Sequence, residues 1–213
     1  DASFQQMREF TLHASHELKT PLTVMRAQLE SLHRERDLLP PEQNSWIEHQ
    51  LDEVARLAKI VDSLSLLTKA DAGLMELERN VVDFRALVLE AFENAAVLAE
   101  SRAIRVTLGE VASAKIVGDR HRLRQLLLIL IDNAVKYNRP EGSIHLSSSS
   151  WDGWVELHVT NEGDSVDEDL RQRVFDRFFR GENAIGKVAG CGIGLTIARW
   201  IARHQRIADA KHR

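Results

Sequence analysis

The sequence lacks the features that mark several classes of protein. Its single cysteine, Cys191, excludes an internal disulfide and fits a reducing compartment. It contains no apolar run long enough to span a bilayer and no visible signal peptide. Lysine and arginine number 28 against 32 acidic residues, giving a net charge of −4, so nothing recommends nucleic acid as a partner.

The sequence does contain enough apolar residues for a packed core. Hydrophobic residues make up 44% of its 213 positions and charged residues 28%, so disorder is not expected. The length suggests one large domain or two modest ones. No internal repeat is visible.

An amphipathic helix with a histidine on its polar face opens the chain. His16 lies off the apolar stripe, so we expect its imidazole to face solvent with the carboxylate of Glu17 beside it. Pro21 cannot donate to the carbonyl of Glu17, so the helix should bend one turn after His16. A lone surface histidine is usually an ordinary solvated residue, and a metal site made of His13 and His16 would lack further ligands. The stripe recurs at steps of three and four and consists of Met7, Phe10, Ala14, Leu18, Leu22, Met25, Leu29 and Leu32.

Two long helices are expected to form a hairpin domain over residues 1–73. The first helix, from about residue 4 to about residue 36, should end before a pair of prolines. Asn44 or Ser45 should cap the second helix, and Gly73 should end it. The second helix carries two apolar rows, more than one partner helix can bury, which predicts a dimeric four-helix bundle. The alternative is that the second row packs on the following domain. The two rows are Ile47, Leu51, Val54, Ala58 and Val61, and Leu57, Ile60, Leu64 and Leu67.

Shorter helices and strands follow, which indicates a second domain over residues 74–213. Two helices, over about 83–102 and 119–137, each begin with an aspartate that can cap the helix. A hairpin is predicted over residues 144–161 because Asp152-Gly153 is a strong turn signal. Further strands are expected at 74–77, 104–108 and 115–117. The mixture predicts an α+β fold in which helices pack on an antiparallel sheet as an α/β sandwich.

Polar and glycine-rich segments of this second domain have residues suited to phosphate. Asn133, Lys136 and Tyr137 share one helix face, where an amide oxygen suits Mg²⁺ and an ammonium suits phosphate. The same residues also suit a helix that has simply reached the surface. The alternating glycines of segment 190–194 precede a helix and let the backbone approach phosphate closely, although a lone glycine motif is weak support. Segment 182–189 lacks periodicity and indicates a mobile loop over a site.

The segment 15–23, Ser-His-Glu-Leu-Lys-Thr-Pro-Leu-Thr, resembles the phosphoacceptor box of bacterial two-component sensor histidine kinases. The resemblance extends over about residues 10–204. It implies a dimerisation and phosphotransfer hairpin followed by the Bergerat-type ATP-binding sandwich shared with DNA gyrase and mismatch-repair ATPases. Four later segments resemble the family's asparagine, first glycine, phenylalanine and second glycine boxes in the family's order: 119–138, 160–166, 174–181 and 190–195.

Matching positions carry the family's roles onto this sequence. The resemblance implies that His16 is the phosphoacceptor, that Glu17 is its general base, and that Thr20 orients water when the partner is dephosphorylated. It also implies that Asn133 is a Mg²⁺ ligand. The other matched positions would contact ATP, and they are Lys136, Tyr137, Asn161, Gly163, Arg180, Gly190, Gly192, Gly194 and Leu195.

The sequence departs from the family pattern in several places. Ile129 stands one turn before Asn133, where the family often has a second asparagine. Asn161 replaces the aspartate that reads adenine, although its amide oxygen can still accept from the adenine amine. Ser165 replaces the second glycine of its box. Gln205-Arg206 stand where the family has a pair of glycines, and the closing strands expected after them are missing from the sequence.

The resemblance implies an ATP-dependent protein-histidine kinase. It would phosphorylate itself on His16 from ATP with Mg²⁺, pass the phosphoryl group to an aspartate of a response regulator receiver domain, and possess phosphatase activity towards that partner. We expect a homodimer that forms the cytoplasmic domain of an inner-membrane sensor, with membrane contact only through segments absent from this sequence. The departures motivate an alternative: a catalytically weakened or phosphatase-biased nucleotide-binding signalling module.

Overall fold

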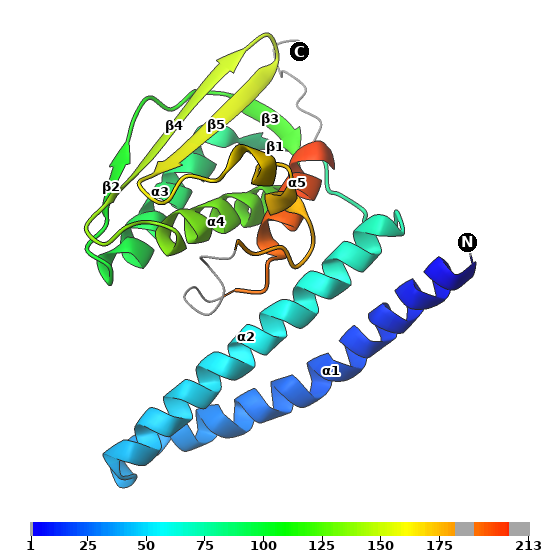
Figure 1. The fold of residues 1–213 in the computed structure, drawn as a ribbon, viewed down its shortest axis with the longest axis vertical. Coiled ribbons are helices and arrows are strands. Elements are labelled where there is room, and N and C mark those ends of the chain that lie inside the picture. The colour runs from blue at the N-terminus through cyan, green and yellow to red at the C-terminus, as the bar shows by residue number, and fades with distance from the viewer. Residues whose placement is uncertain (1, 182–189, 205–213) are drawn as a thin grey trace. The chain divides into compact units, whose positions relative to one another are not determined.

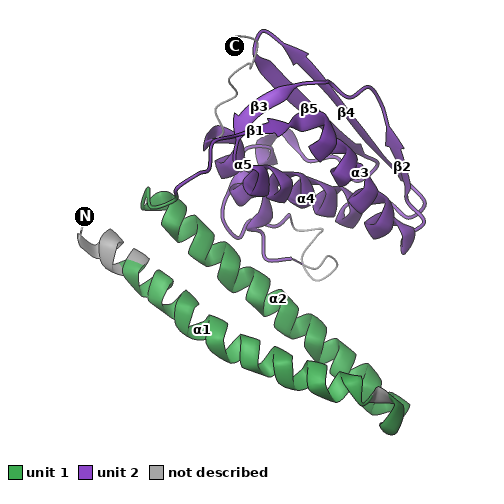
Figure 2. Ribbon diagram, turned by 180° about the vertical axis from the view of Figure 1, so that it is seen from behind, with its two compact units in different colours: residues 1–75 green, residues 76–213 purple. Residues whose placement is uncertain are grey.

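The computed structural model describes residues 2–181 and 190–204 and divides the chain into two compact units, residues 1–75 and 76–213 (Figure 2). The division falls two residues after the boundary expected from the sequence. Within the described residues, no helix is both long enough and apolar enough to cross a membrane.

The first unit is a hairpin of two long helices, α1 (Ala2–Arg34) and α2 (Pro41–Asp71), with a short 3₁₀ helix, η1 (Arg36–Leu38), between them. Helix α1 passes through Pro21 without interruption and curves along its length (Figure 1). The expected caps at Asn44 and Ser45 are wrong. Pro40 occupies the N-cap position without a side-chain hydrogen bond, and proline at the first helical position costs nothing there because the first N–H groups have no helical acceptor.

Gly73 ends α2 as the sequence predicts. Its φ is +68°, and its N–H donates to the carbonyl of Ala70 at 3.1 Å. The N–H of Leu74 donates to the carbonyl of Lys69 at 3.0 Å. These two bonds form the Schellman pattern, which requires a left-handed residue that glycine adopts without a side-chain clash.

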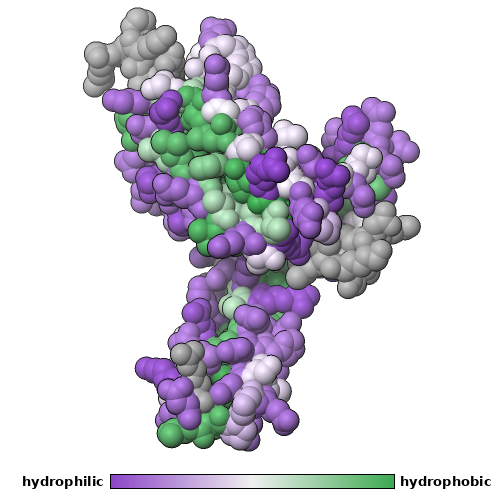
Figure 3. All heavy atoms as spheres, turned by 90° about the vertical axis from the view of Figure 1, so that its left-hand side faces the viewer, coloured by the Kyte–Doolittle hydropathy of each residue, from purple (hydrophilic) through white to green (hydrophobic). Residues whose placement is uncertain are grey.

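The hairpin leaves much of its apolar surface uncovered within one chain. One row of α2 is buried against α1 at Ile47, Val54 and Val61. The stripe of α1, by contrast, remains exposed at Phe10 (73%) and at other members, and hydrophobic residues are visible at the surface of the unit (Figure 3). The exposed large apolar side chains of the hairpin are Met7, Phe10, Leu18, Val24, Met25, Leu32, Leu38, Trp46 and Leu57.

The described residues of the second unit form two small sheets and three main helices. Strands β1 (Asn80–Asp83) and β3 (Lys115–Gly118) pair antiparallel. Strand β4 (Ser143–Trp151) lies between β2 (Arg105–Leu108), to which it is parallel, and β5 (Trp154–Asn161), to which it is antiparallel. The prediction of an antiparallel sheet is therefore wrong for β2, because the chain returns through β3 and α4 before entering β4 in the same direction. The helices are α3 (Phe84–Glu100), α4 (Arg120–Lys136) and α5 (Gly194–His204), with short 3₁₀ helices η2 (Glu168–Leu170) and η3 (Arg173–Phe175).

The strand expected at 74–77 is also wrong, since these residues have irregular backbone. The chain here runs from the end of α2 towards the start of α4, where the N–H of Glu78 donates to the carboxylate of Asp119 at 3.3 Å. Asp119 also caps α4 by accepting from the N–H of Arg122 at 3.0 Å. One buried carboxylate thus anchors the start of the second unit, and the backbone pairs only from Asn80 onward.

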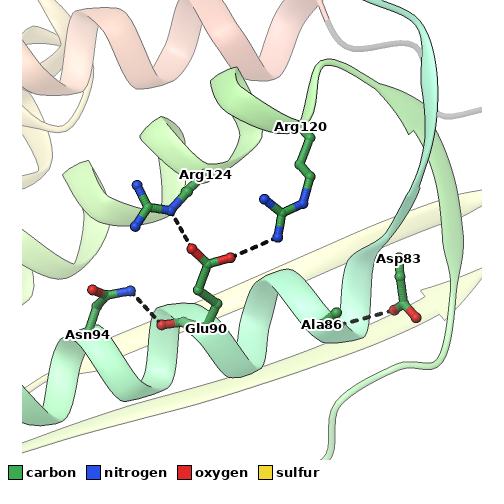
Figure 4. A network of polar contacts seen from close by, with 6 residues as sticks. All are labelled: Asp83, Ala86, Glu90, Asn94, Arg120 and Arg124. Carbon is green, nitrogen blue, oxygen red and sulfur yellow. Dashed lines mark hydrogen bonds and ion pairs between the residues drawn. The ribbon is translucent and has the colours of Figure 1, made fainter.

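Helices α3 and α4 pack side by side on the inner face of the three-stranded sheet (Figure 1). Val88, Ile131 and Leu146 are fully buried in this core, one from each helix and one from β4. The two helices are also joined by Glu90, whose carboxylate binds Arg120 at 3.0 Å and Arg124 (Figure 4). The hydrogen bond from Arg124 and the positive charge of both arginines hold the pKa of Glu90 below its ordinary value.

Candidate phosphoacceptor and nucleotide sites

The first candidate site lies on the polar face of α1. His16, Glu17 and Thr20 are all exposed, whereas their neighbour Ser15 is buried and donates to the carbonyl of Thr11 at 2.7 Å. His16 is exposed as the sequence predicts, although the stripe residues Phe10 and Leu18 are exposed in the single chain as well. An exposed imidazole beside a carboxylate has both a reactive nitrogen open to solvent and a proton acceptor on the same turn.

A salt bridge joins the two helices at this level. Lys19 Nζ lies 2.8 Å from the carboxylate of Asp62 on α2, although both side chains are more than half exposed. Such a pair contributes little free energy by itself. It does connect the turn that contains His16 to the neighbouring helix.

The second candidate site is built around the C-terminal end of α4. The amide nitrogen of Asn133 is buried and has no hydrogen-bond partner in the described part of the chain. A buried polar group without a partner is costly, so this amide suits a ligand or an ion that would complete it. Rotating the amide about its last torsion presents its oxygen instead, which is the atom that a cation would need.

Lys136, one turn from Asp132, is already paired. Its Nζ lies 2.6 Å from the Asp132 carboxylate, and both side chains are about two-thirds or more buried. The guanidinium of Arg102 donates to the carbonyls of Val135 and Lys136 at 3.0 and 3.1 Å and so satisfies the end of the helix. The ammonium of Lys136 is therefore held beside Asp132, one turn before the helix end, where a phosphate would have to compete with or join that carboxylate.

The last residue of β5 and the segment that follows it lie against Tyr137. The amide nitrogen of Asn161 donates to the carbonyl of Tyr137 at 3.4 Å. A β-carbon added to Gly163 would lie 1.9 Å from the same carbonyl oxygen, so only glycine allows this approach. Three residues that the sequence places in two separate boxes, Tyr137, Asn161 and Gly163, thus meet at one backbone oxygen.

Glu162 stabilises the same junction, and the sequence reasoning missed it. Its carboxylate accepts from the Ser143 hydroxyl at 2.8 Å and from the Arg139 guanidinium at 2.8 and 2.5 Å. These partners, the Ser143 hydroxyl first, hold the pKa of Glu162 below its ordinary value. Glu162 lies between Asn161 and Gly163 in the sequence. Its partners Arg139 and Ser143 could be identified only from the strand register.

The second glycine box begins α5 and lies against α4. A β-carbon added to Gly194 would lie 3.3 Å from Cγ2 of Ile129, so Ile129 packs beside the first residue of α5. Gly192 has a φ of +71°, and a β-carbon there would lie 2.5 Å from the carbonyl oxygen of Phe179. The glycine loop, the phenylalanine box and the asparagine face are therefore adjacent, and Ile129 has a packing role in place of a polar one.

The remaining expected contacts are only partly placed by the structure. Arg180, Gly190 and Leu195 are half-buried. A β-carbon on Gly190 would meet nothing within 4 Å. The loop expected to cover the site, residues 182–189, lies outside the described residues. Within the described ranges, no three His, Cys, Asp or Glu side chains are grouped as metal ligands, so a cation here would rely on Asn133 and on oxygens of its ligand.

Two family models match the chain. Residues 6–73 match the His Kinase A (phospho-acceptor) domain, and residues 118–211 match the ATPase described as histidine kinase-, DNA gyrase B- and HSP90-like. The first match contains the exposed His16, and the second contains the junction of α4, β5 and α5. The hairpin and the ATPase-like unit thus each have a family counterpart.

Relatives with both parts are similar along most of the chain. The signal transduction histidine-protein kinase BaeS of Escherichia coli (strain K12) is 32% identical over 91% of this chain and 41% of its own length. The sensor-like histidine kinase SenX3 of Mycolicibacterium smegmatis is 30% identical over 92% of this chain and 51% of its own. The chain therefore spans about half the length of these relatives.

Solved structures of histidine kinases are similar to this chain in fold. The crystal structure of full-length ShkA in complex with AMPPNP gives a TM-score of 0.75 at 26% identity, covering 94% of this chain and 43% of that one. The mycobacterial sensor histidine kinase MprB gives 0.53 at 26% identity over 60% of this chain and 80% of its own. The chain belongs to the two-component sensor histidine kinases and comprises their phosphoacceptor hairpin and ATPase domain.

Proposed function

We propose that the chain is the catalytic core of an ATP-dependent kinase that phosphorylates itself on His16. The observation that carries the proposal is the exposure of His16 beside Glu17 within the matched phosphoacceptor domain. The ATPase domain that follows supplies the second requirement, a place for ATP. The AMPPNP complex of the related ShkA supports the choice of nucleotide.

The chemistry of His16 follows from its two ring nitrogens. Glu17 removes the proton from one nitrogen, and the lone pair of the other nitrogen attacks the γ-phosphorus of ATP. An N–P bond forms, the bond between the γ-phosphorus and the bridging oxygen breaks, and ADP leaves with that oxygen. Apart from His16 and Glu17, the protein contributes to this reaction mainly by positioning the reactants and stabilising the developing charge.

Nucleotide binding is assigned to the junction around Tyr137. Because the amide nitrogen of Asn161 points at the Tyr137 carbonyl, its oxygen is the atom available to accept from the adenine amine. Lys136 would contact a phosphate, and Asn133 would hold Mg²⁺, which supplies charge neutralisation on the phosphates. The further residues proposed to line the nucleotide are Tyr137, Gly163, Arg180, Gly190, Gly192, Gly194 and Leu195.

The partner of the phosphorylated hairpin is proposed to be a response regulator receiver domain, whose aspartate accepts the phosphoryl group. Thr20 lies one turn after His16 and is exposed, so its hydroxyl can orient water for the reverse, dephosphorylating reaction. We propose that the domain lies in the cytoplasm, because the phosphoryl donor ATP is found there. Any membrane attachment would be made by segments outside this sequence.

A homodimer is proposed to cover the exposed stripe of α1. A hairpin of two helices has too small a core to be stable alone, and Leu18, Met25 and Leu32 form an uncovered row at intervals of seven residues. Pairing two hairpins into a four-helix bundle would bury that row. Light scattering of the fragment 1–73 should then give the mass of a dimer at micromolar concentration, and a folded monomer would contradict the proposal.

Ile129 motivates a second candidate function, a nucleotide-binding module that acts mainly as a phosphatase. Its side chain packs on Gly194 and offers no oxygen to a cation, which favours a module that binds nucleotide weakly and mainly dephosphorylates its partner. Incubation with γ-labelled ATP and Mg²⁺ distinguishes the two. A labelled product that loses its label in acid but keeps it in base supports the kinase, and nucleotide binding without labelling supports the second function.

A further inference from the structure

One backbone oxygen outside the proposed ligand contacts receives two side chains of α5. The carbonyl of Phe175, at the end of η3, accepts from the Thr196 hydroxyl at 2.9 Å and from Nη2 of Arg199 at 3.3 Å. Thr196 and Arg199 are three residues apart, so they lie on one face of α5. A carbonyl at the end of a helical turn has no partner within the turn, and here α5 provides two.

Arg199 holds Phe175 in a second way. Its guanidinium carbon lies 5.2 Å from the centre of the Phe175 ring, within the range of a cation–π contact. Both residues are half-buried, so the contact is partly shielded from water. A single side chain thus fixes both the carbonyl and the ring of Phe175, which a lysine could not do because it lacks the planar fork.

The segment that starts at Phe175 is tied to the glycine loop. The N–H of Phe178 donates to the carbonyl of Gly192 at 3.0 Å, and a β-carbon on Gly192 would lie 2.5 Å from the carbonyl oxygen of Phe179. Arg173 lies over the Phe179 ring at 4.9 Å. The position of Gly192 therefore depends on the backbone of residues 175–179, and that backbone is held by α5.

We propose that Thr196 and Arg199 are positioning residues of the nucleotide site. They bind the Phe175 carbonyl, keep segment 175–179 against the Gly192 loop, and so shape the backbone that faces the phosphates. They touch no part of the nucleotide themselves. The effect on the nucleotide rests on the proposed function, whereas the link from α5 to the glycine loop rests on the hydrogen bonds and ring contacts of Phe175, Phe178 and Gly192.

Hydrogen exchange of the full chain without nucleotide tests the link directly. In Thr196→Val, which removes the hydroxyl and keeps the branched shape, and in Arg199→Met, exchange of the Phe178 amide should quicken roughly fivefold, the scale of one lost hydrogen bond. Thr196→Ser should restore the parent rate. Arg203→Met, an exposed arginine one turn later on α5, should leave the rate unchanged. Unchanged exchange in both Thr196→Val and Arg199→Met overturns the inference.

Nucleotide binding then tests the consequence. Both variants should bind AMPPNP roughly fivefold more weakly than the parent does. They should bind adenosine as tightly as the parent does, because adenosine lacks the phosphates that face the glycine loop. Equal loss of AMPPNP and adenosine binding would mean general damage to the domain and would overturn the positioning role. If the parent chain binds neither ligand while the exchange result holds, the proposed function fails and the structural link remains.

Discussion

Gly163 lies so close to Tyr137 that a β-carbon on the glycine would stand 1.9 Å from the tyrosine's carbonyl oxygen. The contact joins the segment after β5 to the end of α4. It brings Asn161 and Gly163 next to the end of α4, the helix that contains Asn133. The nucleotide site proposed above depends on this approach.

Replacing Gly163 by alanine should therefore reduce both nucleotide binding and stability. The backbone must move by more than an ångström to relieve the overlap, and we expect AMPPNP binding to fall by about tenfold or more, with about 2 kcal/mol of lost stability. Titration calorimetry and urea unfolding measure the two effects. Gly181→Ala is the matched control for stability, since a β-carbon there meets nothing within 4 Å. Parent-like binding by Gly163→Ala would place the nucleotide elsewhere.

Glu17 and Thr20 should separate two reactions on one helix. Glu17→Gln should slow autophosphorylation by about a hundredfold, because the neutral amide cannot accept the proton from His16. Thr20→Ala should leave autophosphorylation nearly intact and slow dephosphorylation of the response regulator. Label transfer assays measure both, with Thr23→Ala, exposed one turn further along, as the control. Equal loss of both activities in both variants would indicate damage to the helix instead.

Ile129 and Asn133 should differ sharply in their effect on Mg²⁺. Ile129 offers no oxygen, so water should complete the coordination of the ion, which readily keeps its waters. Ile129→Asn should lower the Mg²⁺ needed for half-maximal autophosphorylation, with some lost packing against Gly194. Ile129→Val removes only the terminal Cδ1 methyl, keeps the Cγ2 that faces Gly194 and adds no oxygen, so it should leave the Mg²⁺ midpoint unchanged.

Asn133→Ala should be far more damaging, because Asn133 is the proposed protein ligand on this helix. Its autophosphorylation should need much more Mg²⁺, or should be lost. A Mg²⁺ titration that matches the parent would show that α4 does not hold the metal.

Glu90 should stabilise the second unit in a pH-dependent way. Its pKa is lowered in the folded chain from the ordinary value of 4.5, so its contribution is complete above that value and is lost as the pH falls through the folded pKa. Glu90→Gln should cost about 1 kcal/mol at pH 7, as expected for a charge-assisted pair of hydrogen bonds that is partly exposed. Urea unfolding at pH 7 and pH 3 measures the difference.

The gap between Glu90→Gln and the parent should narrow towards pH 3. Glu93→Gln, on the same helix but exposed, is the control and should show little effect at either pH. A gap of the same size at both pH values would mean that the substitution acts through packing, with no contribution from the ion pairs to Arg120 and Arg124.

Much of the fold could be predicted because its signals are local. Asp83 and Asp119 cap their helices by accepting from N–H groups three residues ahead, at 3.1 and 3.0 Å. Asp152 and Gly153 adopt the positive φ values, 45° and 77°, that a two-residue hairpin turn requires. These features depend on a few neighbouring residues and on backbone sterics, so a sequence pattern reveals them.

The parts that the sequence did not reveal depend on distant partners. The parallel pairing of β2 with β4 follows from the path of the whole unit. Glu162 meets Arg139 and Ser143 only because the end of β5 lies beside the start of β4. Ile129 packs on Gly194, so this apolar departure from the family pattern has a packing role that the sequence alone did not reveal.

The identity of the phosphorylated residue tests the central claim most directly. His13 and His16 are both exposed and one turn apart on α1, so each is the other's control. After incubation with γ-labelled ATP and Mg²⁺, His16→Gln should lose all acid-labile label while still binding AMPPNP, and His13→Gln should be labelled like the parent. Full labelling of His16→Gln, or loss of label only in His13→Gln, would contradict the assignment of His16 as the phosphoacceptor.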